Sequence, residues 1–144
     1  MNILINSSDA GKYISLQIEQ MHKEKIEKLK KIEEELKIGE TEVINQKNVI
    51  SKEEFDKKIS ELRIKARDYQ KQRNINAKSL SEKRTKATDN LLKLIQPILT
   101  EFASKNSISI IFQKKVIVIG KVEFDITNQI LDLLNKKHKK INLD

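Results

Sequence analysis

The residues that could take part in chemistry are mostly basic and are concentrated in one stretch of the chain. Between Arg63 and Lys86 nine basic residues stand against two acidic ones, whereas the whole chain carries a net charge of +8. Such a run can attract chains of negative charge, including acidic unfolded proteins and lipid headgroups, or it can be a solvated helix face. The candidate residues for capturing such chains are Arg63, Lys65, Arg67, Lys71, Arg73, Lys78 and Arg84.

No residue pattern indicates catalysis or a metal site. His22 and His138 lie far apart and the chain has no Cys, so neither histidine nor thiolate metal ligation is expected. The sequence contains no Gly-rich loop of the kind that cradles phosphates. Asp125 next to Thr127 is better interpreted as a helix cap than as a catalytic pair. We therefore expect a protein that is not an enzyme and that needs no metal ion or cofactor.

The spacing of apolar residues predicts a long helical hairpin over residues 14–96, referred to below as the arm. Leu29, Ile32 and Leu36 follow the three-four spacing that a second helix covers in a coiled coil. The candidate N-caps of this first helix are Ser7, Ser8 and Asp9. The same spacing returns in the second helix at Phe55, Ile59, Leu62, Ala66 and Tyr69.

A short turn between the two helices predicts that they are antiparallel neighbours. Ser51 and Glu54 form a capping box that starts the second helix, which places the tip of the arm near residues 45–54. Pairing residues outward from this turn predicts the register of the hairpin. The predicted pairs are Phe55 with Ile44, Leu62 with Leu36, and Tyr69 with Leu29.

Three features interrupt the arm. Gly39 is expected to mark a bend, and Pro97 is expected to kink or break the second helix where the arm ends. Apolar residues thin out between Gln70 and Asn90, which predicts loose packing there. The apolar residues at the tip and in the thin stretch either pack in the arm or contact a binding partner; they are Ile50, Tyr69, Ile75 and Leu80.

Residues 1–13 and 97–144 are predicted to form a small α/β body. Ile108–Gln113 and Val116–Ile119 are rich in β-branched residues and are separated by Lys114 and Lys115, a pattern typical of a β-hairpin. A last helix is expected to start at a cap formed by Asp125 or Thr127 and to end near Asn135. Two strands and one helix are too few to bury their own apolar faces, so self-association is expected. The fold class is therefore mainly α with a small β body.

Four short segments, taken in their order and spacing, resemble a known family. They are "SSDAGKYISLQIE", "VISKEEFDKKISELR", "IQPILTEFASKNSISIIF" and "FDITNQILDLLN". The chain resembles the Skp (OmpH-like) family of periplasmic chaperones, and the resemblance spans essentially the whole chain. The last segment is similar to the closing Asp-Ile-Thr helix of that family.

The resemblance implies a periplasmic homotrimer whose strands join in one central body. Three arms would surround a cavity that holds unfolded outer-membrane β-barrel proteins, without ATP and without chemistry. Apart from the resemblance, the basic run of the arm makes anionic lipid headgroups a further candidate partner. The residues expected to form the trimer body are Ile108, Ile110, Phe112, Val116, Val118, Ile126 and Ile130.

The resemblance is incomplete at the N-terminus. The family's mature chain begins with a β-strand before the position matched by Met1 and Asn2, and neither that strand nor a signal peptide is present here. We expect either that the sequence begins inside the protein or that the body sheet is shorter than the family's.

Two functions of other classes compete with a chaperone. A basic coiled coil that binds nucleic acid would suit the charge, but only Tyr13, Tyr69 and four Phe are available, and no aromatic stacking platform alternates with the basic residues. Nucleic acid is therefore a less favoured partner. A scaffold or stalk protein would need continuous apolar seams, whereas this seam fades in the middle of the arm.

Overall fold

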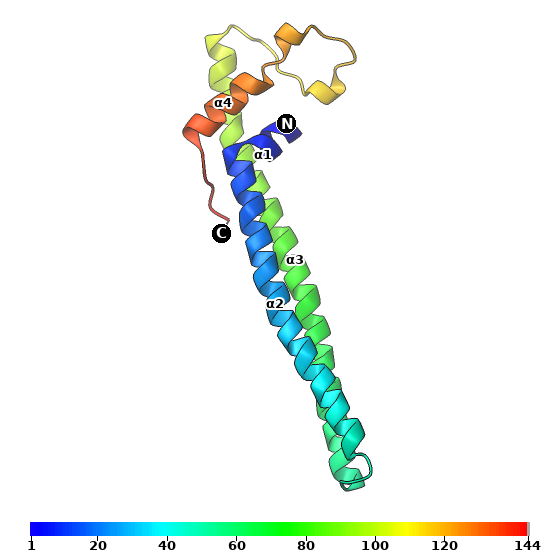
Figure 1. The fold of residues 1–144 in the computed structure, drawn as a ribbon. Helices are drawn as coiled ribbons and strands as arrows, with labels where there is room; N and C mark the ends of the chain where they lie inside the picture. The colour runs from blue at the N-terminus through cyan, green and yellow to red at the C-terminus, as the bar shows by residue number, and fades with distance from the viewer. Residues whose placement is uncertain (144) are drawn as a thin grey trace. The chain divides into compact units, whose positions relative to one another are not determined.

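The computed structural model describes residues 1–143, and every regular element within that range is helical (Figure 1). The four α-helices are α1 (Asn2–Ser7), α2 (Asp9–Gln46), α3 (Lys52–Lys105) and α4 (Thr127–Lys137). Two short 3-10 turns, η1 (Lys114–Val116) and η2 (Val122–Phe124), lie between α3 and α4. The chain divides into two compact units: the terminal unit, which combines Met1–Glu19 with the chain from Glu82 onward, and the hairpin unit, Gln20–Ser81.

The predicted helical hairpin is confirmed. Within the hairpin unit α2 and α3 are antiparallel neighbours, joined by the turn at residues 47–51 (Figure 1). The Glu54 backbone N–H donates to the Ser51 hydroxyl at 3.2 Å, so Ser51 caps the start of α3 as its position in the capping box predicts. This cap satisfies one of the orphan N–H groups at the helix start and helps to fix where the chain reverses.

The predicted register of the hairpin is wrong by about one helical turn. The Tyr69 hydroxyl donates to Glu33, four residues after its predicted partner Leu29, and Leu62 lies beside Gly39, three residues after its predicted partner Leu36. The prediction aligned apolar residues alone. The α2–α3 contact also includes polar and small residues, which shift the alignment. The predicted Phe55–Ile44 pair also fails, because Ile44 is 71% exposed.

Neither Gly39 nor Pro97 interrupts its helix. α2 runs without a break to Gln46, and Gly39 makes room for Leu62, whose Cδ1 would lie 2.8 Å from a Cβ at this position. α3 continues through Pro97 to Lys105. Pro97 and Lys93, whose carbonyl loses its helical donor, both lie on the exposed face of α3. That carbonyl can bind water instead, so the helix tolerates the proline.

The core of the terminal unit joins residues from both ends of the chain. Its buried members come from α1, the start of α2, the end of α3 and α4; they are Leu4, Ala10, Ile14, Ala87, Leu91, Ile95, Ile98, Ile130 and Leu134. The chain bends at Ser8, whose buried hydroxyl accepts a hydrogen bond from the Gly11 N–H at 3.1 Å, which confirms Ser8 among the predicted N-caps. The Asp9 N–H donates to Oδ1 of Asn135 at 2.8 Å, so α4 supplies a second cap to α2.

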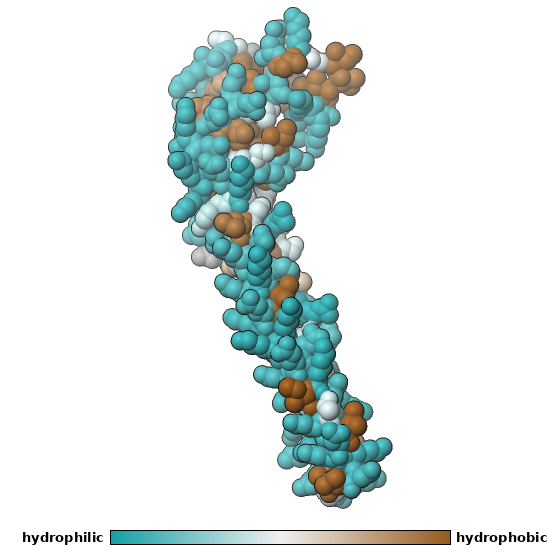
Figure 2. Space-filling model, in the orientation of Figure 1, coloured by the Kyte–Doolittle hydropathy of each residue, from teal (hydrophilic) through white to brown (hydrophobic). Residues whose placement is uncertain are grey.

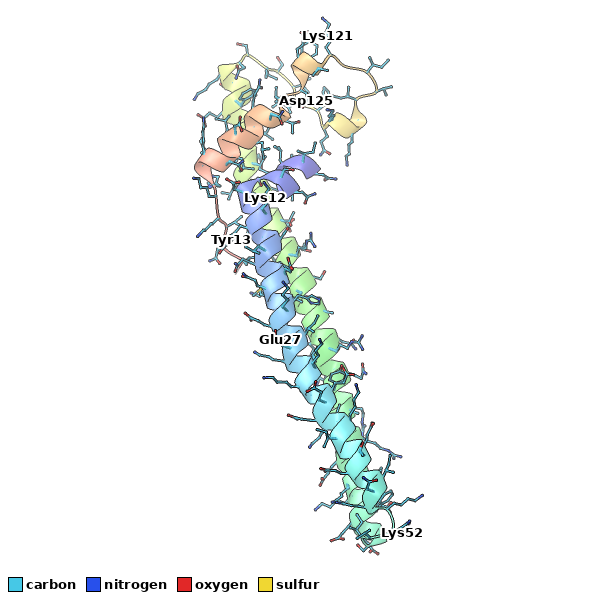
Figure 3. All side chains as sticks on the ribbon, in the orientation of Figure 1. Lys12, Tyr13, Glu27, Lys52, Lys121 and Asp125 are labelled. Atoms are coloured by element: carbon cyan, nitrogen blue, oxygen red, sulfur yellow. The ribbon has the colours of Figure 1, made fainter. Side chains whose placement is uncertain are left out.

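The chain after α4 returns to the start of α2. Lys140 Nζ lies 5.8 Å from the centre of the Tyr13 ring, within the range of a cation–π contact. Ile141 and Leu143 pack against the core of the terminal unit. Figure 3 shows Lys12 and Tyr13 on the first turns of α2, where the tail meets the helix.

The predicted β-hairpin is not formed: residues 1–143 contain no strand. The turn predicted at Lys114 and Lys115 is present as η1, but the runs on either side of it are irregular and, apart from the half-buried Ile108, solvent-exposed, with Val118 at 96% exposure. A pair of strands needs an apolar face to cover, and the single chain offers this segment none. The prediction assigned strands from β-branched residues, whose preference depends on packing that is missing here.

Asp125 anchors the end of this segment to α4. Contrary to the prediction, neither Asp125 nor Thr127 is the N-cap: that position is Ile126, which makes no side-chain cap hydrogen bond, and Thr127 is the first residue of the helix. Its carboxylate accepts hydrogen bonds from Lys114 Nζ at 2.6 Å and from both the backbone N–H and the hydroxyl of Thr127. The Lys114 hydrogen bond, followed by those from Thr127, lowers the pKa of Asp125 well below its ordinary value. α4 then runs to Lys137, two residues beyond the predicted end.

Candidate functional site

The basic residues predicted to capture a partner all lie on α3 and are all exposed. Six of them belong to the hairpin unit and Arg84 belongs to the terminal unit. Arg63, Arg67 and Lys71 are four residues apart and share one face of the helix. Arg73 lies on another side, near enough to α2 for its charge to act on Glu33. The basic surface is therefore broad rather than a single stripe.

A polar cluster ties the two helices together in the middle of the hairpin unit. Glu33 binds Lys37 at 2.9 Å and accepts a hydrogen bond from the Tyr69 hydroxyl at 3.3 Å. The Lys37 hydrogen bond, and to a lesser degree the Tyr69 hydroxyl, lowers the pKa of Glu33. Tyr69 is thus half-buried between the helices, and its hydroxyl makes a link within the hairpin.

A second polar contact joins α2 and α3, at residues that are closer in sequence to the terminal unit. Lys25 Nζ donates to Oδ1 of Asn76 at 3.1 Å, and this hydrogen bond is partly buried. Asn76 occupies the position one heptad after Tyr69, where a coiled coil would place an apolar residue. The thinning of the apolar seam predicted after Gln70 therefore corresponds to a polar stretch of the helix contact.

The apolar residues predicted to retain a partner differ in exposure. Ile75 is 54% exposed, whereas Ile50, Tyr69 and Leu80 are half-buried. Figure 2 shows that hydrophilic side chains cover most of the visible face of the hairpin and that separate hydrophobic groups interrupt them. The hairpin unit has other exposed apolar residues that were not predicted to contact a partner: Ile26, Ile38, Ile44, Val49 and Ile64. Ile38 and Ile44 fall outside the three-four spacing of Leu36 and Val43, a signal that could have identified them.

The residues predicted to form a trimer body differ in how exposed they are. Ile110, Phe112, Val116 and Val118 are exposed on the loop that carries η1 and η2. Ile108 and Ile126 are half-buried, and Ile130 is inside the core of its own unit. The same loop exposes further apolar side chains, which sequence reasoning did not select: Ile117, Ile119, Val122 and Phe124. Hydrophobic side chains gather over this loop in Figure 2.

An exposed apolar surface of this kind marks an interaction site. Monomeric proteins rarely expose contiguous hydrophobic patches, and those that do generally use them for binding. Here the exposed residues are carried on an irregular segment whose regular turns are η1 and η2, and the stretches outside these turns can form strands in a sheet with another chain. The loop between α3 and α4 is therefore a candidate surface for a protein partner.

No group of three or more His, Cys, Asp or Glu side chains in residues 1–143 is placed to hold a metal ion. Among the helices of the same range, none combines the length and the hydropathy required to cross a bilayer.

Three comparisons with known proteins agree. The family model for outer membrane protein (OmpH-like) matches residues 1–134. A Skp-like protein of Pseudomonas aeruginosa is 26% identical over 133 residues, which cover 90% of this chain and 77% of that protein. The crystal structure of a candidate outer membrane chaperone (OmpH-like) from Caulobacter crescentus superposes with a TM-score of 0.93, at 16% identity, over 98% of this chain and 83% of that one. The chain therefore belongs to the OmpH/Skp-like family of outer membrane protein chaperones.

Proposed function

We propose that the protein is an ATP-independent holding chaperone for unfolded outer-membrane β-barrel proteins in the periplasm. The observation that carries the proposal is the surface of the hairpin unit, where exposed basic residues of α3 lie among isolated exposed apolar side chains. Many weak, non-directional contacts suit a partner that has no fixed structure, because no contact requires one shape. The membership of the chain in the OmpH/Skp-like family supports the same function.

Assembly into a homotrimer would complete the fold. The apolar loop between α3 and α4 is unpaired in the single chain, and we propose that its two runs become strands when copies meet. Ile110, Phe112, Val116 and Val118 would then be covered by neighbouring copies, and three hairpins would surround the client. Sedimentation equilibrium tests this step: a folded monomer at micromolar concentration would exclude it.

The exposed Arg residues of α3 would act first, by attracting negatively charged stretches of a client. Electrostatic capture speeds encounter and weakens with salt, whereas apolar contacts such as those of Ile75 prolong the complex. Replacing Arg63, Arg67, Arg73 and Arg84 with Gln should slow capture most at low salt and leave the oligomer nearly unchanged, because exposed charges add little to stability. Equal capture rates in the variant and the parent would show that the basic surface is only a solvated helix face.

A paired assay separates this function from nucleic-acid binding. A urea-unfolded β-barrel protein is diluted into buffer with and without the chaperone, in the absence of nucleotide, and aggregation is followed by light scattering. In parallel, a fluorescent oligonucleotide is titrated over a range of salt concentrations, since phosphate binding falls steeply with salt. Suppressed aggregation supports the holding function. Oligonucleotide binding at physiological salt with unchanged aggregation would instead favour the nucleic-acid function.

A further inference from the structure

The hairpin unit carries opposite net charges at its two ends. We define the tip segment as residues 32–62, and the root segment as residues 20–31 together with 63–81. The tip segment contains nine acidic and five basic residues, a net charge of −4. The root segment contains three acidic and eleven basic residues, a net charge of +8.

The fold turns this sequence pattern into two separate charged regions. Lys58 donates to Gln46 and Leu62 lies beside Gly39, so the α2 and α3 parts of the tip segment are neighbours in space. The Lys25–Asn76 hydrogen bond brings the two parts of the root segment together in the same way. At a rise of about 1.5 Å per residue, the centres of the two segments on α2 are about 20 Å apart. This exceeds the Debye length of about 8 Å at physiological ionic strength, so each end acts as its own charge.

The charge pattern is complementary to itself under a two-fold rotation. Two hairpins laid side by side in parallel bring tip to tip and root to root, so like charges meet at both ends. Two hairpins laid antiparallel bring each acidic tip onto a basic root, and the same contact forms twice. A contact of this kind is isologous and pairs one hairpin with one other. In the proposed homotrimer the three hairpins extend from one body, so the antiparallel partner belongs to a second trimer.

Both ends also expose apolar side chains that such a contact would cover. Ile44 and Val49 of the tip segment are 71% and 80% exposed, and Ile64 and Ile75 of the root segment are about half exposed. Electrostatic complementarity guides the encounter and fixes the alignment, and burial of these side chains adds the apolar contribution to binding.

We propose that the hairpin of a second copy docks antiparallel on this one, acidic tip on basic root. The contact covers Arg63, Arg67 and Ile75, which under the proposed function capture and retain clients. That consequence rests on the proposed function: in the absence of a client, two copies mask each other's client-binding surfaces, and an incoming client displaces the partner.

Cysteine cross-linking tests the alignment directly, because the chain has no Cys of its own. Thr41→Cys marks the tip and Asn74→Cys marks the root; both residues are exposed and uncharged. The two variants are mixed and oxidised at about 0.01 M ionic strength, where the Debye length is about 30 Å, and at about 1 M, where it is about 3 Å. Antiparallel docking predicts that the tip–root disulfide makes up a larger share of all cross-links at low salt than at high salt, and that this excess at low salt is lost at high salt.

Charge reversal supplies the matched control. Glu40→Lys, Glu42→Lys and Glu61→Lys change the tip segment from −4 to +2 and should abolish the excess of tip–root disulfide. Asp89→Lys, Glu123→Lys and Asp132→Lys change the total charge equally, but in the terminal unit, and should preserve it. A tip–root share of the disulfides that is no higher at low salt than at high salt, or an unchanged tip–root share in the tip variant, would overturn the proposal. The readout needs no client, so a failure of the holding function leaves it intact.

Discussion

Gly11→Ala is expected to destabilise the terminal unit although it adds only one methyl group. A Cβ at position 11 would lie 1.6 Å from the carbonyl oxygen of Ile5 and 2.7 Å from its carbon. A backbone carbonyl cannot rotate away as the end of a side chain can, so α1 has to move off the start of α2. The third close atom, Ser8 Oγ at 3.1 Å, belongs to the cap of α2 and is already hydrogen-bonded to the Gly11 N–H.

The size of the effect is bounded by two ways of relieving the clash. A small shift of α1 resembles ordinary overpacking, which costs about 1–3 kcal/mol. Complete release of α1 exposes Leu4, which is 5% exposed, and losing the contacts of a buried leucine costs about 2–5 kcal/mol. The higher helix propensity of Ala recovers at most about 1 kcal/mol. We therefore expect a net loss of about 1–4 kcal/mol in the free energy of unfolding.

Urea unfolding followed by circular dichroism measures this loss, at equal protomer concentrations because self-association would shift the midpoint. Gly39→Ala is the matched control: its Cβ would meet only the flexible end of Leu62, so its effect should be smaller. Leu4→Ala combined with Gly11→Ala should lose less than the sum of the two single changes, since both act through α1. A Gly11→Ala protein as stable as the parent would show that α1 accommodates the added methyl group without cost.

Three further predictions concern the terminal unit. Ser107 has a φ of 55° where Ile108 N–H bonds the Ala103 carbonyl at the end of α3, so Ser107→Gly should stabilise the protein by about 1 kcal/mol in thermal unfolding. Asn135→Ala removes the cap on the Asp9 N–H and should cost about 1 kcal/mol in urea unfolding; no loss would show that the contact contributes little. Hydrogen bonds from Lys105 and Lys137 lower the pKa of Glu101 to about 2. Glu101→Gln should therefore lower the free energy of unfolding by its full amount above pH 4.5, the ordinary pKa, and this loss should vanish as the pH falls towards 2. A difference between parent and Glu101→Gln that does not change with pH would contradict this.

The helical hairpin could be predicted from the sequence because its signals are local. Ser51 caps the helix that begins next to it, and the three-four spacing of Leu29, Ile32 and Leu36 defines a helix face without any knowledge of the rest of the chain. Register could not be predicted in the same way. It depends on the Tyr69–Glu33 and Lys25–Asn76 hydrogen bonds and on the fit of Leu62 to Gly39, which an alignment of apolar residues does not include.

Contacts between distant parts of the chain also could not be predicted from the sequence pattern. Asn135 caps a helix that begins 126 residues earlier, and nothing near Asn135 indicates this role. The strands predicted at Ile108–Gln113 and Val116–Ile119 are missing from the single chain for the opposite reason: their local preference is strong, but no other part of the chain supplies a face to pack on. For the candidate binding surface, the exposure of the basic residues could be predicted because they lie outside the apolar spacing. The half-burial of Tyr69 and Leu80 could not, because it depends on the contact between α2 and α3.

Site-specific photo-cross-linking can show whether the hairpin unit holds the unfolded client. A photoreactive residue is placed at Lys71 or Ile75 in the hairpin unit, or at Lys93 or Thr100 in the terminal unit as controls, since all four side chains are exposed on α3. Each variant is mixed with a urea-unfolded β-barrel protein on dilution and irradiated. Client adducts are expected from positions 71 and 75, and few are expected from positions 93 and 100. Adducts confined to the terminal-unit positions would show that the hairpin unit does not hold the client.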